Sequence, residues 1–116
     1  MFKVTTEPKF THRVAVQVPI DGGYVAQDFR VTFRVVDGDK LRSDDSDEVV
    51  THASVIEEQK EALRRIIIEM HDLVGEDDQP VPYSDALREQ LIALPFVRLA
   101  LNTAYVAAMT KAKAGN

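Results

Sequence analysis

The side chains best suited to metal chemistry in this sequence are its three histidines, and their spacing does not match a metal site. His12, His52 and His71 are far apart, whereas paired zinc ligands usually lie about three to five residues from each other. Glu69 and Asp72 are close to His71, but residues two apart do not face each other if this segment is helical. No cysteine is present, which excludes thiolate zinc sites and cysteine nucleophiles.

The carboxylates are numerous, but they concentrate in polar segments where strong pKa shifts are least expected. A metal-dependent hydrolase could use four of them: Asp37, Asp39, Asp44 and Asp45. Leu41, however, stands where an EF-hand calcium loop needs an oxygen ligand. Gly22-Gly23 leads into a strand pattern rather than a helix, and no serine lies in a G-x-S-x-G context. These observations favour a binding protein with no cofactor and no metal over an enzyme, with the hydrolase as a minor alternative.

The composition is that of one globular domain. The chain has 116 residues, and 45% of them are hydrophobic. Its net charge is −5, and its positive residues form no dense stripe that could neutralise phosphates, so we expect no nucleic-acid partner. No run approaches ~18 uninterrupted apolar residues, and the first residues lack the apolar core of a signal peptide. We therefore expect a soluble, cytoplasmic protein without a membrane partner.

Two runs with the period of a half-buried strand, 10–18 and 25–35, flank the turn residues Asp21-Gly22-Gly23. They predict an antiparallel hairpin with one apolar face. That face carries Phe10, His12, Val14, Val16 and Val18 from the first run, and Val25, Gln27, Phe29, Val31, Phe33 and Val35 from the second. We expect His12 to be a hydrogen-bonded residue at the core or its rim. Because a lone hairpin is marginal in water, helices or another chain must cover its apolar face.

A polar connection, Asp37 to Glu48, separates the hairpin from a helical region. The helix that follows has apolar residues at helical spacing: Val49, Ala53, Ile56, Leu63, Ile67 and Met70. Three consecutive β-branched residues, Ile66 to Ile68, would suit a strand equally well, so the end of this helix stays open. Asp72 to Pro82 then predicts a turn or short extended excursion.

Two further helices are predicted near the end of the chain. Ser84 is placed to cap a short helix, and Pro95 fits the first position of the next, so a break falls between them. The last helix, roughly 95–113, is apolar around most of its circumference except for a stripe through Arg98 and Asn102. Such a helix is either central to the core or shaped to meet a partner, and both can hold on different faces.

The segment from Ile66 to Ser84 resembles the central signature of the tail assembly chaperones of long-tailed bacteriophages. Its matching residues are the aliphatics Ile66, Ile67, Ile68, Leu73 and Val74, the acidic turn at Glu76 and Asp77, and the run Pro80, Val81, Pro82, Tyr83 and Ser84. The flanking residues Leu87, Leu91, Ile92, Pro95, Phe96, Val97, Ala100 and Tyr105 are also similar to the family. Two positions depart from it: Met70 stands at a tryptophan position, and Asp78 replaces a turn glycine. Methionine can fill an aromatic pocket, and aspartate tolerates a left-handed turn.

The resemblance implies a chaperone that binds the tape measure protein in the host bacterial cytoplasm, prevents its aggregation during tail assembly, and meets the major tail tube protein. The runner-up is a structural tail or head–tail connector component acting as an interaction module. We expect an α+β fold of one domain, 1–116, with a hairpin region 1–36, an acidic linker 37–48 and a helical region 49–114. The hairpin or small sheet should pack against three helices. Self-association or partner binding is expected through Phe96, Leu99, Tyr105, Met109, Phe29 and Phe33.

Overall fold

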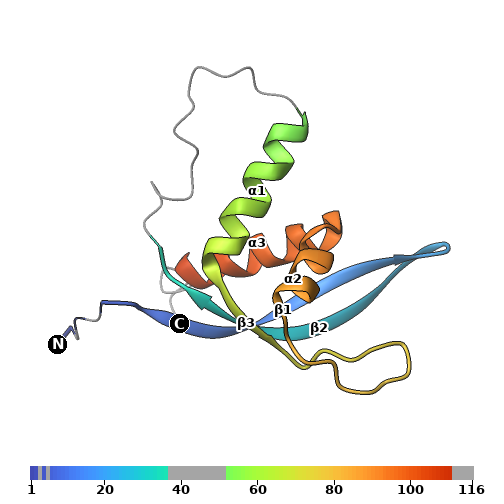
Figure 1. Cartoon of the computed structure of the whole chain (residues 1–116), viewed down its shortest axis with the longest axis horizontal. Helices are drawn as coiled ribbons and strands as arrows, with labels where there is room; N and C mark the ends of the chain where they lie inside the picture. The colour runs from blue at the N-terminus through green and yellow to red at the C-terminus, as the bar shows by residue number, and fades with distance from the viewer. Residues whose placement is uncertain (3, 5, 37–51, 111–116) are drawn as a thin grey trace.

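A computed structural model describes residues 1–2, 4, 6–36 and 52–110, and of His52 the backbone alone. The elements follow the order β1 (Lys9–Ile20), β2 (Gly23–Arg34), α1 (His52–Ile66), β3 (Ile67–His71), α2 (Asp85–Ile92) and α3 (Pro95–Thr110). The strands form one antiparallel sheet in the order β1-β2-β3, and the helices lie on one side of it (Figure 1). The α+β prediction is therefore confirmed. The predicted linker 37–48 lies outside the described residues.

The hairpin forms in the predicted register. Ile20 faces Gly23 across the turn, where Gly22 has a φ of +80°, and Val14 faces Phe29 further along. The predicted inward face is the buried one for most of its length, with Val14, Val16, Phe29, Val31 and Phe33 in the core. His12 is half-buried on the same face, as expected for a residue at the rim.

The end of the first helix, which the sequence left open, lies at Ile66, and the chain enters β3 without a connecting loop. Of the two possibilities for Ile66 to Ile68, the strand begins at Ile67, because β-branched residues fit the pleated surface of a strand and β2 offers a free edge for them to pair with. A β-bulge lies where Thr32 faces Glu69 and Phe33 faces Ile67. The extra residue in this strand explains why Ile67 and Met70, three positions apart, are both buried.

The excursion between β3 and α2 folds back on itself. Val74 bridges to Pro80, and the Val81 N–H donates to the Leu73 carbonyl at 2.8 Å. Asp78 has a φ of +61°, so an aspartate does occupy the left-handed turn conformation there. The Ser84 hydroxyl then accepts a hydrogen bond of 3.1 Å from the Leu87 N–H, which confirms the predicted helix cap.

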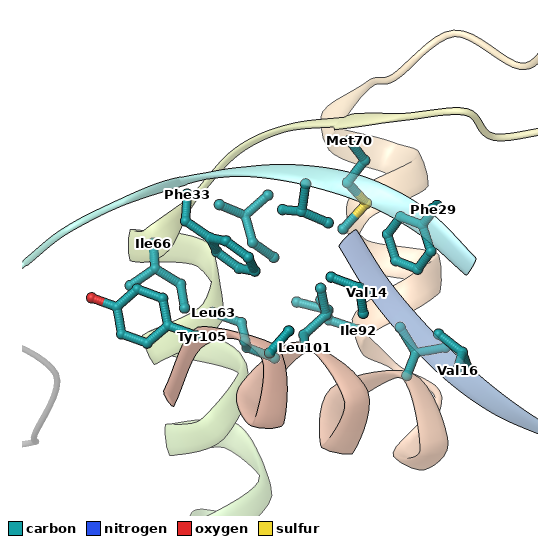
Figure 2. Close-up of a cluster of buried hydrophobic side chains, with 14 residues drawn as sticks. Val14, Val16, Phe29, Phe33, Leu63, Ile66, Met70, Ile92, Leu101 and Tyr105 are labelled. Atoms are coloured by element: carbon teal, nitrogen blue, oxygen red, sulfur yellow. The ribbon is translucent and has the colours of Figure 1, made fainter. Parts of the chain in front are cut away.

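The core lies between the sheet and the helices (Figure 2). The Tyr105 ring packs against Phe10 and Phe33, with ring centroids 6.1 and 5.5 Å apart. α3 begins at Pro95 as predicted, and it runs over the hairpin so that its C-terminal part lies above the start of β1 (Figure 1). Because α3 covers only part of the hairpin, the hairpin tip projects beyond the helices.

Candidate functional site

One hollow of the described surface is a groove between α1 and α3, which we call the α1/α3 groove. Its volume is about 370 Å³. Residues of α1 form one wall: Gln59, Ala62, Leu63 and Ile66. Residues of α3 form the other: Pro95, Arg98, Leu99, Asn102 and Tyr105. The walls are mostly apolar, and three polar side chains, those of Gln59, Arg98 and Asn102, interrupt them.

The helical repeat explains why these residues share a groove. The wall positions on each helix recur at intervals of three and four residues, the spacing that keeps side chains on one helix face. α1 is fixed at its C-terminal end, where Leu63 and Ile66 are buried in the core. α3 is fixed along its length by Val97, Leu101 and Ala104, which are buried in the core. The groove is therefore a junction between two amphipathic helices.

Arg98 lies at the base of this groove and is only 8% exposed. Its Nη1 atom donates hydrogen bonds to the carbonyl oxygens of Ile92 and Ala93, at 2.9 and 3.0 Å, at the end of α2. Its Nε atom is buried and has no hydrogen-bond partner within the described part of the chain. The sequence assigned Arg98 to a polar stripe of the last helix, whereas the structure buries it as a cap on the carbonyl end of another helix.

A second hollow, of about 320 Å³, lies between the hairpin and the start of α3, and we call it the hairpin groove. Its apolar lining comes from the hairpin, from the segment after β3, and from α2 and the start of α3: Val16, Val18, Phe29, Leu73, Val74, Leu91, Leu94, Phe96 and Val97. Gln27, Asp28 and Asp72 complete it. Asp72 is ion-paired with Arg30, with Oδ2 and Nε 2.7 Å apart, which lowers the pKa of Asp72.

The six residues expected at a partner surface fall into different environments. Leu99 and Tyr105 line the α1/α3 groove, but Leu99 is 69% exposed whereas Tyr105 is buried. Phe29 and Phe96 line the hairpin groove, the first buried and the second half-buried. The two remaining residues lie in neither groove: Phe33 is in the core, and Met109 is exposed near the end of α3.

Sequence reasoning missed the wall that α1 contributes. The signal was present, since Gln59, Ala62, Leu63 and Ile66 have helical spacing in the printed sequence. The fact that this face lies beside α3 depends on tertiary packing, which spacing alone does not determine.

An ion-pair network ties α1 to α2 away from the groove. Arg64 contacts Glu57, Glu61 and Glu89, and its Nη2 atom lies 2.8 Å from the Glu89 carboxylate. Hydrogen bonds from Arg64, helped by Arg88, lower the pKa of Glu89 to about 2. Because Glu57, Glu61 and Arg64 point away from the wall residues of α1, Arg98 is the one charged residue among those lining the groove.

The described residues contain no group of three or more histidine, cysteine or acidic side chains that could hold a metal ion. Glu69 and His71 lie on strand β3 and not on a helix, and alternate residues of a strand share a face. His71 Nδ1 is 3.9 Å from Glu69 Oε2, and its Nε2 is 2.9 Å from the Thr32 hydroxyl. The candidate carboxylates Asp37, Asp39, Asp44 and Asp45 lie outside the described residues.

No family model, no curated protein and no solved structure matches this chain. In the part of the chain that the structure describes, no single helix is long and apolar enough to cross a membrane; α2 and α3 together would be, but they are bent by 101° at the break between them.

Proposed function

We propose that this protein is a tail assembly chaperone that binds an amphipathic helix of a phage tape measure protein and keeps that protein soluble during tail assembly. The observation that carries the proposal is the α1/α3 groove. A hollow between two crossing helices, with a mostly apolar lining and a solvent-exposed leucine on one wall, suits helix-in-groove recognition. The partner itself comes from the resemblance of residues 66–84 to the chaperone family.

The lining of the groove suits an apolar helix face. Its lining is apolar at Ala62, Leu63, Ile66 and Leu99, and its polar groups lie at separate points along it. A client helix could place apolar side chains at positions i, i+3 and i+4 between the two walls. Burying one leucine-sized side chain contributes about 1.5–3 kcal/mol, so a few such contacts give a reversible complex. Reversibility suits a chaperone that tail tube subunits must displace.

Co-expression with the tape measure protein of the same phage or prophage tests the proposal. We expect the wild-type protein to raise the soluble amount of tape measure protein and to co-purify with it. Leu99→Asp should reduce co-purification about tenfold or more, because a charge in the groove must lose water when the client binds. Leu99 is already exposed, so the variant should stay folded.

Ala107→Asp is the matched control. It places the same charge on an exposed position of the same helix, but Ala107 is not part of the groove lining. We expect it to bind like the wild type. If the wild type neither solubilises nor co-purifies with the tape measure protein, the chaperone proposal is wrong. If Leu99→Asp binds as well as Ala107→Asp, the α1/α3 groove is not the client site.

A further inference from the structure

The outer edge of β1 has no strand beside it in the described structure. β1 is the first strand in the sheet order and pairs with β2 alone. It is 12 residues long, about twice the usual length of a strand. Long unpaired edges offer a row of backbone donors and acceptors to another chain, so natural proteins usually shorten or cover them.

The hydrogen-bond pattern identifies which residues point to this edge. The Val35 N–H donates to the Pro8 carbonyl at 2.9 Å, and the same register continues through Phe10–Phe33 to Ile20–Gly23. Antiparallel strands alternate, so the even-numbered residues of β1 bond to β2 and the odd-numbered ones direct their backbone groups outward. The outward residues are Lys9, Thr11, Arg13, Ala15, Gln17 and Pro19. Pro19 has no N–H, but because its backbone groups point outward, no hydrogen bond to β2 is lost.

The charges of β1 are placed so that two copies of the strand can pair antiparallel without bringing like charges together. Its two charged residues, Lys9 and Arg13, both lie before Val14, and the half that follows Val14 has none. If two copies pair antiparallel about Val14, Arg13 lies opposite Ala15 of the second copy, and Lys9 lies opposite Pro19. A pairing centred on Arg13 would instead put two arginines face to face, which is unfavourable.

In this antiparallel arrangement, exposed apolar side chains at one end of β1 come close to those at the other end of β1 in the second copy. At the hairpin tip, Ile20 and Val25 on the inner face are 55% and 41% exposed, because the helices do not reach them. At the other end of β1, Val106 and Met109 are exposed beyond the Tyr105 ring that covers Phe10. Antiparallel pairing about Val14 would put Val18 of each copy opposite Phe10 of the other, and Ile20 opposite Pro8. This is the end of β1 above which the last turns of α3 lie (Figure 1).

We propose that β1 is the interface between two copies of this chain, which pair antiparallel about Val14 and form one continuous six-stranded sheet. The pairing adds backbone hydrogen bonds at Thr11, Arg13, Ala15 and Gln17 of each copy. It leaves the α1/α3 groove open on both copies, since that groove lies on the helices and not at the sheet edge. This proposal does not depend on the identity of the client.

Cross-linking tests the register, because the chain contains no cysteine of its own. Thr11 lies opposite Gln17 of the second copy, whereas the two copies of Thr11 lie roughly 20 Å apart at ~3.3 Å per residue. A mixture of Thr11→Cys and Gln17→Cys proteins should form a disulfide-linked dimer under mild oxidation. Neither protein alone should do so, since a disulfide needs Cα atoms closer than about 7 Å.

The oligomeric state gives the second measurement, by light scattering over a range of protein concentrations. We expect the wild type to dimerise and Ala15→Lys to weaken the dimer at least about tenfold, because two new lysines would face Arg13 of the opposite copy. Ala26→Lys, on the same sheet face but on β2, should dimerise normally. A wild type that is monomeric at all concentrations overturns the proposal. So does a dimer that fails to cross-link Thr11→Cys to Gln17→Cys.

Discussion

The Nη1 atom of Arg98 lies 2.9 Å from the carbonyl oxygen of Ile92, so a residue of α3 caps the end of α2. The two helices are separated by a short break, and this hydrogen bond, with a second one to Ala93, fixes the bend between them. The last carbonyls of a helix have no intrahelical partner, and a cation near them is favourable. Arg98 therefore positions one wall of the α1/α3 groove.

Replacing Arg98 by methionine should destabilise the protein by about 2 kcal/mol, because two carbonyls at the end of α2 lose a charged donor. Removing a buried charge offsets part of that loss. Arg34→Met is the control: its Nη1 atom also donates to a backbone carbonyl, that of Arg65, but at an exposed site. We expect the control to lose less than about 0.5–1 kcal/mol. Urea unfolding measures both, and equal losses would contradict a capping role for Arg98.

The Glu89 carboxylate should make stability depend on pH. Its pKa is about 2 in the folded protein, against an ordinary value of 4.5, so its contribution is present above pH 4.5 and is lost as the pH falls toward 2. Its side chain is 41% exposed, and solvent screening limits the effect to about 1 kcal/mol or less. The free energy of unfolding, measured across this range, should fall more steeply for the wild type than for Glu89→Gln.

Glu76→Gln is the control for this pH experiment. Glu76 is exposed and forms no ion pair among the described residues. Its pH profile should run parallel to that of the wild type. A Glu89→Gln profile that also runs parallel would show that the Arg64–Glu89 contact does not stabilise the fold.

The turn at Asp78 should accept glycine and reject a β-branched residue. Its φ of +61° is unfavourable for side chains with a Cβ atom, least so for aspartate and asparagine. We expect Asp78→Gly to change the free energy of unfolding by less than about 1 kcal/mol. Asp78→Val should lower it by about 1–3 kcal/mol. Thermal unfolding of both variants measures this difference, and a stable Asp78→Val protein would contradict the turn geometry.

Met70 should tolerate leucine better than tryptophan. It is 3% exposed and faces Val31 across the sheet, so its pocket is already full. Met70→Leu should cost less than about 1.5 kcal/mol, whereas Met70→Trp should cost about 1–3 kcal/mol through overpacking. Calorimetric unfolding of the two proteins tests this. A Met70→Trp protein as stable as the wild type would mean that the pocket can expand.

Local sequence signals predicted the parts of the fold that neighbouring residues determine. The alternation around Asp21-Gly23 gave the hairpin and its register, and Ser84 and Pro95 marked two helix starts. The end of α1 was harder, because Ile66 to Ile68 fit a helix and a strand equally well and the free edge of β2 decided between them.

The candidate site was only partly predictable for a similar reason. Leu99 was identified from the excess of apolar residues on the last helix. The separation of exposed Leu99 from buried Tyr105 required knowing which side of α3 faces the sheet. Arg98 was misplaced because a charged residue in an apolar helix suggests a solvent-facing stripe, whereas here the carbonyl end of α2 offers it hydrogen-bond acceptors.

The direct passage from α1 into β3 at Ile66 and Ile67 has a mechanical consequence. α1 is anchored by Leu63 and Ile66 near this junction, and most of its first ten residues are exposed. The helix, about 22 Å long at ~1.5 Å per residue, is therefore held at the end that joins the sheet and exposed to solvent at the other. A tilt of about 10° at this junction would move the far end of α1 by roughly 4 Å and change the width of the α1/α3 groove.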